Sequence, residues 1–201
     1  MRLRQRVYDL KFLRTKEEKY VFFIDLKAAY DSVNHRKLFS KMKLKGYSTE
    51  IINAIKVIYS SARMRLNTLQ KYINVNRGVL QGGILSPWLF NIYIDDLVTS
   101  LKTVSFEVLA YADDLAVICK NKAELNKVID LLEGWATSNE IAVNRKKSGI
   151  LVIDNDRNDM HHHRGYPVKM TYKYLGIKLN NQLSPLSGLE ETKKKLAVYL
   201  M

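Results

Sequence analysis

The sequence predicts an α+β protein in which an antiparallel sheet is backed by helices. Two segments rich in aromatic and β-branched residues, 20–26 and 106–118, have the composition of buried strands. Segments with helical apolar periodicity follow them, and the strands are joined by hairpins rather than by repeated βαβ units. The length of 201 residues is enough for one domain with a well-buried core.

The first half of the chain carries one strand, two helices and a hairpin. Residues 20–26 contain a single charge, which predicts a buried strand ending at an acid. Residues 62–66 and 71–75 alternate in the manner of a β-hairpin. The second of the two helices begins after Ser48 and is expected to bury one apolar face, made of Ile51, Ile52, Ile55, Ile58 and Tyr59.

The second half begins with a helix at Ser86-Pro87, because serine is a good N-cap and proline suits the first helical turn. This helix should run to about Lys102. Residues 106–118 should form two short strands around Ala112-Asp113-Asp114. A capping box at Asn121 and Glu124 then predicts a further helix, which buries Leu125, Val128, Ile129, Leu132, Trp135 and Ala136.

The C-terminal third predicts strands at 148–153, 168–172 and 174–179. The polar segment 154–165 between the first two is expected to be an exposed loop. It contains His161–His163, but adjacent side chains in a loop rarely converge on one metal, so a variable loop is favoured over a zinc site.

The charge balance favours a polyanionic partner. Lysine and arginine number 33 against 20 acidic residues, a net charge of +13, which points to nucleic acid first and to an anionic membrane surface second. A basic compartment would also account for the charge.

The single cysteine, Cys119, excludes an intramolecular disulfide framework and is expected to be a buried structural thiol. A single cysteine also suits a reducing interior, so we expect an intracellular protein, with mitochondrial, nuclear and bacterial cytoplasmic locations left open. No apolar run is long enough to span a membrane, and no membrane partner is expected.

Three aspartates follow apolar strands. Asp25 ends the first strand, and Asp113 and Asp114 lie in the turn of the later pair. Carboxylates beside buried apolar residues are costly without a compensating cation, and oxygen ligands without nearby cysteine or histidine favour Mg²⁺ or Mn²⁺. Carboxylates converging from separate strands suit phosphoryl transfer with two metal ions. Ordinary turn aspartates are the competing interpretation for each acid taken alone.

Five blocks between residues 22 and 179 together decide between these interpretations. They are Phe23-Ile-Asp25-Leu-Lys-Ala-Ala-Tyr30-Asp31, Arg77-Gly-Val-Leu-Gln81-Gly82-Gly83-Ile-Leu-Ser86-Pro87, Ala110-Tyr111-Ala112-Asp113-Asp114, Asn144-Arg-Lys-Lys147-Ser148 and Tyr174-Leu175-Gly176. In this order they resemble the palm motifs of reverse transcriptases, of the group II intron, retron and non-LTR retrotransposon types rather than the retroviral type. The second block is the most specific of the five.

The resemblance implies roles for individual residues. Asp25, Asp113 and Asp114 would hold two Mg²⁺ ions, with Mn²⁺ as an alternative, and the Leu26 carbonyl would be an added ligand. Lys147, or its neighbour Lys146, would protonate the leaving pyrophosphate, although a solvated surface lysine competes with this role. The substrate-binding residues would be Leu26, Tyr30, Gln81, Gly82, Tyr111 and Ala112, with Tyr30 as the gate that excludes a 2′-hydroxyl, and Tyr174, Leu175 and Gly176 would form the primer grip.

The resemblance implies an RNA-directed DNA polymerase with an RNA template, a DNA or RNA primer and dNTPs as partners. The predicted organisation is a basic N-terminal segment at 1–19 as a remnant of fingers, a palm and fingers core at 20–180, and a linker with the start of a truncated thumb at 181–201. A fragment, one part of a split enzyme completed by a second polypeptide, and a domesticated, non-catalytic palm that binds RNA or a ribonucleoprotein remain alternatives.

Overall fold

The computed structural model describes residues 18–61, 63–66, 71–74, 77–153 and 161–181. The chain divides into two compact units, which are described separately. The first unit comprises residues 1–25, 98–134 and 143–201, and the second comprises 26–97 and 135–142. The predicted segments 1–19 and 181–201 fall almost entirely outside the described residues.

The first unit is built on a four-stranded sheet in the order β4-β5-β1-β6. The strands are β1 (Lys19–Ile24), β4 (Glu107–Tyr111), β5 (Asp114–Cys119) and β6 (Gly149–Ile153). Every neighbouring pair is antiparallel, as the sequence predicts. The first strand ends at Ile24 rather than at residue 26, so Asp25 is the first residue beyond it.

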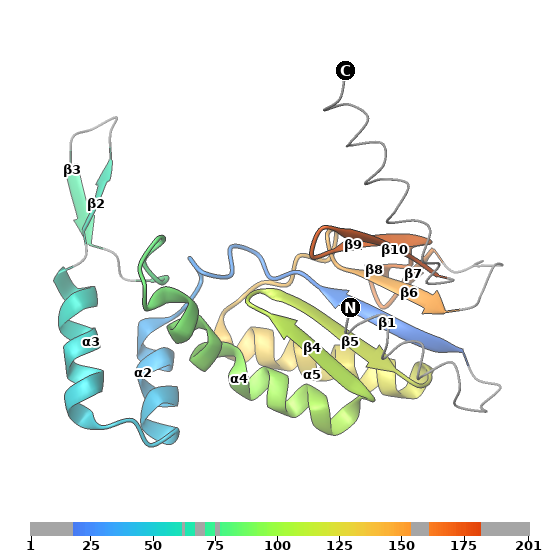
Figure 1. The fold of residues 1–201 in the computed structure, drawn as a ribbon, viewed down its shortest axis with the longest axis horizontal. Helices are drawn as coiled ribbons and strands as arrows, with labels where there is room; N and C mark the ends of the chain where they lie inside the picture. The colour runs from blue at the N-terminus through green and yellow to red at the C-terminus, as the bar shows by residue number, and fades with distance from the viewer. Residues whose placement is uncertain (1–17, 62, 67–70, 75–76, 154–160, 182–201) are drawn as a thin grey trace, which may run out of the picture. The chain divides into compact units, whose positions relative to one another are not determined.

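The two faces of this sheet are covered by different elements (Figure 1). Val21 and Phe23 belong to an apolar cluster with the hairpin of β9 (Thr171–Tyr174) and β10 (Ile177–Asn180), and the Phe23 ring stacks on Tyr172 with 4.2 Å between centroids. On the other face lies the helix α5 (Lys122–Asn139), seen below the sheet in Figure 1. The buried α5 residues of this unit are Leu125, Val128, Ile129 and Leu132, as predicted.

The capping box at the start of α5 is confirmed in part. The Asn121 side chain accepts a hydrogen bond from the Glu124 N–H at 2.9 Å, and the Glu124 carboxylate accepts one from the Lys120 N–H rather than from Asn121. Cys119 is fully buried, and burial raises the pKa of its thiol, which agrees with a structural role.

Two predictions for the C-terminal part of this unit are wrong. Within the segment 154–165 expected as a loop, His162–His163 form the short strand β7, which pairs with β8 (Tyr166–Pro167) just beyond it. His163 and Arg164 also bond to Asn126 and Asp130 of α5. The strands expected at 168–172 and 174–179 lie at 171–174 and 177–180. Their turn is Leu175-Gly176, where φ is 47° and 79°.

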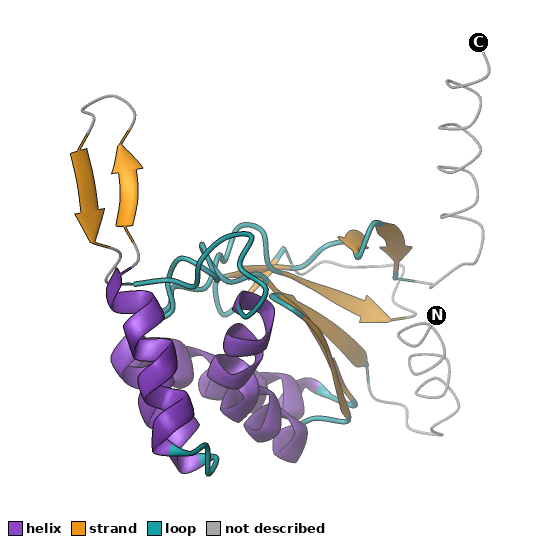
Figure 2. Cartoon of the chain, turned by 60° about the vertical axis from the view of Figure 1, so that its left-hand side comes forward, coloured by secondary structure: helices purple, strands orange, loops and turns teal. Residues whose placement is uncertain are grey.

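The second unit contains α2 (His35–Leu44), α3 (Thr49–Ser61), the predicted hairpin of β2 (Arg63–Leu66) and β3 (Lys71–Asn74), and the first part of α4 (Ser86–Val104). Figure 2 shows these helices and the separate hairpin. The predicted buried face of α3 holds for Ile52, Ile55 and Tyr59. It is wrong for Ile51 and Ile58, which are 46% and 44% exposed because they lie at the margin of the stripe formed by the other three.

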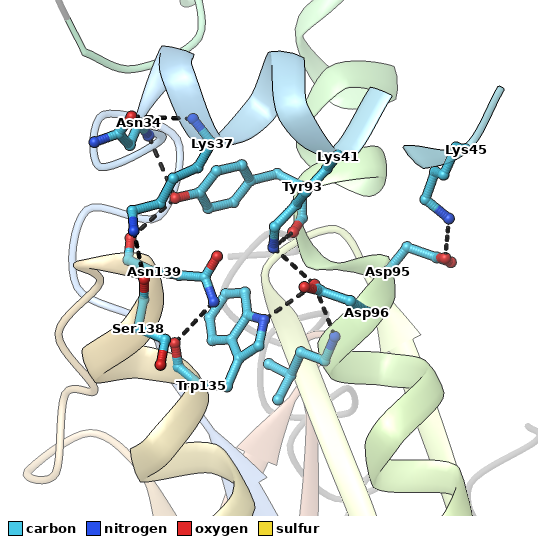
Figure 3. Close-up of polar contacts among 11 residues, drawn as sticks. Asn34, Lys37, Lys41, Lys45, Tyr93, Asp95, Asp96, Trp135, Ser138 and Asn139 are labelled. Carbon is cyan, nitrogen blue, oxygen red and sulfur yellow. Dashed lines mark hydrogen bonds and ion pairs between the residues drawn. The ribbon is translucent and has the colours of Figure 1, made fainter. Parts of the chain in front are cut away.

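Lys41 of α2 contacts residues of both α4 and α5 in the second unit (Figure 3). The Lys41 ammonium lies 4.5 Å from the Tyr93 ring centroid and 5.0 Å from that of Trp135, and it donates to the Tyr93 carbonyl and the Asp96 carboxylate. The Trp135 indole also donates to Asp96, at 3.0 Å. Burial lowers the pKa of Lys41, and Asp96 partly offsets that effect. Of the helices that the structure describes, none is long and apolar enough to cross a membrane.

Candidate active site

The sheet register of the first unit brings the predicted carboxylates to one edge. Ile24 of β1 pairs with Leu115 of β5, so one residue further along the two strands Asp25 lies opposite Asp114. Asp113 occupies the two-residue turn between β4 and β5. Strands far apart in the sequence therefore deliver three acids to the same end of the sheet.

The electrostatics agree with this clustering. The pKa of Asp114 is raised, first by partial burial and then by the negative charges of Asp113 and Asp25. Burial raises the pKa of Tyr172 on β9 to about 12, and the charges of Asp25 and Asp114 add to the shift. Neighbouring carboxylates that disfavour one another's ionised form can be stabilised by a divalent cation.

The backbone of Asp25 is held on both sides by the segment that carries the predicted general acid. The Asp25 N–H donates to the Ser148 hydroxyl at 3.0 Å, and the Asp25 carbonyl accepts from the Asn144 N–H at 2.8 Å. The segment is closed by a bond from the Ser148 N–H to the Asn144 carbonyl, and the Asn144 side chain accepts from the Lys147 N–H. We refer to residues 144–148 as the lysine turn. It places the exposed Lys147 in the same unit as the acids and next to the backbone of Asp25.

The tip of the β4–β5 hairpin is strained. Tyr111 is 69% exposed and pairs with Asp114, and Ala112 between them has φ of 52°. A non-glycine residue in the left-handed region costs about 1 kcal/mol or more, and such residues cluster at functional sites. Both residues lie beside the carboxylates.

The predicted primer-grip residues form the end of the β9–β10 hairpin. Tyr174 is buried in the apolar cluster with Phe23, and its pKa is raised by burial and by Asp114. Leu175 is 47% exposed, and Gly176 follows it in the turn. Tyr174 is therefore a core residue as well as a candidate contact, whereas Leu175 is accessible.

The remaining predicted substrate-binding residues belong to the second unit. The ring of Tyr30 stacks on Phe90 at 4.6 Å, and its carbonyl accepts from the Val79 N–H. The Gln81 amide donates to the Asp31 carboxylate at 3.0 Å. Leu26 and Gly82 complete the predicted set in this unit: Leu26 is buried, and a Cβ built on Gly82 would meet nothing within 4 Å. The space beside Gly82 is thus open, which agrees with a close approach of substrate to the backbone.

A glycine is required at position 78, where the segment that carries Gln81 passes against the backbone of Asp31. Its φ is +90°, and a Cβ would lie 2.9 Å from the Asp31 Cα and 3.0 Å from the Asp31 carbonyl oxygen. His35 fixes the same peptide from another side, because its Nε2 lies 2.7 Å from the Gly78 carbonyl. The segment that carries Gln81 is therefore fastened to the segment that carries Tyr30.

Several residues that hold the candidate site residues in place have no role predicted from the sequence. Asn144, Ser148, Asp31 and Gly78 lie inside the recognised blocks, so their place in a block was a usable signal. His35 was marked by no pattern.

We refer to the end of the sheet that carries Asp25, Asp113 and Asp114 as the acidic edge. Its donor chemistry fits Mg²⁺, because three carboxylates supply only hard oxygen ligands. Within the described ranges, no three His, Cys, Asp or Glu side chains are arranged so that they could hold a metal ion. The fit therefore rests on donor type and on the mutual proximity of Asp25 and Asp114.

An antiparallel sheet with acids from a central strand and from an adjacent hairpin at one edge defines the palm class of polymerase folds. The chain belongs to the reverse transcriptase (RNA-dependent DNA polymerase) family, whose profile matches residues 2–179. The predicted family and fold class are thereby confirmed.

The relatives come from retrotransposons. The chain is 27% identical over 145 residues to the Retrovirus-related Pol polyprotein from the type-1 retrotransposable element R2 of Nasonia vitripennis, covering 67% of the chain and 14% of that protein. It is 24% identical over 201 residues to the RNA-directed DNA polymerase from mobile element jockey of Drosophila melanogaster, covering 88% of the chain and 21% of that protein. Of the types named from the sequence, these represent the non-LTR retrotransposon type.

Among solved structures, the chain is similar to apo telomerase from Candida tropicalis truncated from its C-terminal domain. The TM-score is 0.65 at 19% identity, with 91% of the chain and 39% of that structure covered. Telomerase of the same species in complex with a TWJ fragment of telomeric RNA gives a TM-score of 0.67 at 18% identity, covering 91% of the chain and 32% of that structure. At this identity the likeness supports the fold.

Proposed function

We propose that this chain is the core of an RNA-directed DNA polymerase that adds dNTPs to a primer 3′-hydroxyl by two-metal nucleotidyl transfer. The observation that carries the proposal is the acidic edge, where the register of β1 and β5 sets Asp25 opposite Asp114 and the hairpin turn adds Asp113. The chain spans only 14% and 21% of the length of the two relatives described above, so activity and partners are inferred for this core and not read from them.

In this proposal Asp25, Asp113 and Asp114 hold Mg²⁺, with Mn²⁺ as a substitute and the Leu26 carbonyl as a further ligand. When bound, the two ions supply charge neutralisation at the attacking and leaving oxygens. Lys147 donates a proton to the leaving pyrophosphate, and the bonds between the lysine turn and the Asp25 backbone support this role by fixing their relative position.

The remaining residues bind and orient substrate. Tyr30 lies under the sugar and excludes a 2′-hydroxyl, while Gln81, Gly82, Tyr111 and Ala112 contact the nucleotide. Leu175 and Gly176, at an accessible turn, and Tyr174 behind them position the primer. The net charge of +13 supports an RNA template and a DNA or RNA primer as partners.

The test is Mg²⁺-dependent extension of a DNA primer on an RNA template, comparing the chain with the Asp113→Asn/Asp114→Asn double variant. Extension by the wild-type chain, reduced by at least about 10³-fold in the variant, is the expected result. A salt-sensitive RNA affinity equal in both proteins, without extension by either, would overturn the proposal and favour a non-catalytic palm that binds RNA or a ribonucleoprotein. A Tyr30→Ala variant should lose discrimination between dNTPs and rNTPs.

A further inference from the structure

Lys169 lies beside the acidic edge of the first unit, outside the five recognised blocks. Its N–H donates to the Ile150 carbonyl at 2.8 Å, and the preceding residue, Val168, forms a parallel bridge with Ile150. The backbone of this residue is therefore attached to β6, directly after the lysine turn.

The side chain of Lys169 runs back across β6 to the lysine turn. A Cβ built on Gly149 would lie 2.8 Å from the Lys169 Cδ, 3.0 Å from its Cε and 3.1 Å from its Nζ. The lysine side chain can therefore cross β6 here because residue 149 has no side chain. The ammonium donates to the Lys147 carbonyl at 3.0 Å and to the Lys146 carbonyl at 3.5 Å. It also lies 4.9 Å from the centroid of the Tyr172 ring.

These contacts connect Lys169 to Asp25. The carbonyls it binds belong to the turn whose ends, Asn144 and Ser148, hold the Asp25 backbone. Tyr172, under the ammonium, stacks on Phe23, two residues before Asp25. Burial lowers the pKa of Lys169 and the charge of Asp25 raises it, so the two charged groups lie within electrostatic reach.

We infer that Lys169 is a positioning residue of the acidic edge: its ammonium holds the lysine turn closed and thereby fixes Asp25 and Lys147 relative to each other. This role rests on the proposed function, in which both residues act on the nucleotide. A half-buried ammonium bound to two carbonyls and facing an aromatic ring gives a fixed geometry that an exposed lysine lacks.

The variants are Lys169→Met, which keeps the aliphatic stem, and Lys169→Arg, which keeps a charged donor. Gly149→Ala places a methyl group in the path of the side chain and so displaces the ammonium without removing its charge. Lys127→Met is the matched control, because Lys127 is an exposed lysine on α5 and its loss changes the net charge by the same amount.

Amide hydrogen exchange tests the structural step without any need for activity. Lys169→Met should speed exchange at Asn144, Lys147 and Ser148 by about tenfold, and leave the amides of β1 and β5 unchanged. Gly149→Ala should have the same effect to a smaller extent, and Lys169→Arg should restore part of the protection. Unchanged exchange in Lys169→Met would overturn the inference.

Single-turnover extension tests the functional step. Lys169→Met should lower the maximal rate by about 10- to 100-fold, with the dNTP affinity changed by less than about threefold, because misplacement of reacting groups affects the rate more than binding. A loss of dNTP affinity with an unchanged rate would overturn positioning in favour of direct substrate contact. If the wild-type chain fails to extend primers, the proposed function fails, and hydrogen exchange alone decides whether Lys169 orders the turn.

Discussion

The two units hold their candidate functional residues by different means. In the first unit, Asp25 and Asp114 are placed by the register of paired strands, and the Asp25 backbone is bonded at both its N–H and its carbonyl. In the second unit, Gln81 is held by a side-chain bond to Asp31, and Tyr30 by a ring stack. The comparison indicates that the acids depend on sheet geometry, whereas the Gln81 amide and the Tyr30 ring depend on side-chain contacts that a single substitution can remove.

The surface contacts of the second unit add little to this support. Glu140 pairs with Arg77 and with Lys37, and its carboxylate is half exposed. Exposed ion pairs contribute about 0–1 kcal/mol. Two other contacts of this unit are expected to contribute more. Gly78 lies against the backbone of Asp31, and the Lys41 ammonium lies over the rings of Tyr93 and Trp135.

The largest effect on stability is expected from Gly78→Ala in the second unit. The added Cβ would meet backbone atoms of Asp31 at 2.9–3.0 Å, and the residue would also be strained at φ +90°. We expect the free energy of unfolding in urea to fall by about 3 kcal/mol. Gly46→Ala is the matched control, because φ there is +81° but nothing lies within 4 Å, so only about 1 kcal/mol should be lost. Equal losses would contradict the role of the clash.

Ser148→Ala tests the backbone support of the first unit. The hydroxyl is fully buried and accepts from the Asp25 N–H, so its removal leaves a donor without its partner. The expected loss is about 2 kcal/mol, together with faster hydrogen exchange at the Asp25 amide. Ser40→Ala, at an exposed helix position, should change stability by less than about 0.5 kcal/mol. An unchanged exchange rate at Asp25 would argue against this support.

Lys41→Met separates an enclosed lysine from an exposed one. Lys41 lies between Tyr93 and Trp135 and bonds Asp96, with its side chain 13% exposed. Its replacement should cost about 1–1.5 kcal/mol in denaturant unfolding. Lys45→Met, which breaks the more exposed pair with Asp95, should cost less than about 0.5 kcal/mol. Similar costs for both variants would mean that the aromatic enclosure contributes nothing.

The smallest effect concerns pH and His163. Burial, then Lys122 and Arg164, lower the pKa of this imidazole, so the folded state disfavours its protonation. The associated stability is therefore present above the unfolded pKa of about 6.5 and is lost as pH falls through the folded value. Stability should decline slightly below pH 6.5 in the wild type and less in His163→Gln, with His162→Gln as the exposed control. A decline of the same size in all three proteins would remove His163 as its source.

Much of the fold follows from local patterns in the sequence. The first strand, the helix from Ser86 and the Asn121 cap are each determined by neighbouring residues, and the structure has all three, with the strand ending at Ile24 instead of residue 26. The predictions are wrong at two places. His162 and His163 form a strand by pairing with Pro167 and Tyr166, and His163 is also held by Asn126 of α5, 37 positions away in the sequence. Leu175-Gly176 turns the chain where strand-forming residues were expected to continue, with Leu175 in the left-handed region that non-glycine residues rarely adopt.

Motif order predicts which residues form the candidate site, but it does not predict the contacts that hold them in place. Motif order located Asp25, Asp113 and Asp114, and pairing of the strands then set two of them opposite each other. The bond between Asp25 and Ser148 joins residues 123 positions apart, and the path of the Lys169 side chain over Gly149 depends on tertiary packing. Contacts of this kind leave no periodic signal in a single sequence.

The proposed chemistry requires that the acidic edge binds a divalent cation. The most direct measurement is Mn²⁺ binding followed by electron paramagnetic resonance in the wild-type chain, in Asp25→Asn and in Asp114→Asn, with Asp130→Asn as a control that removes one acid elsewhere in the same unit. We predict that both site variants lose affinity by at least about tenfold, while the control binds as the wild type does. Equal Mn²⁺ affinity in all four proteins would contradict a cation site at this edge of the sheet.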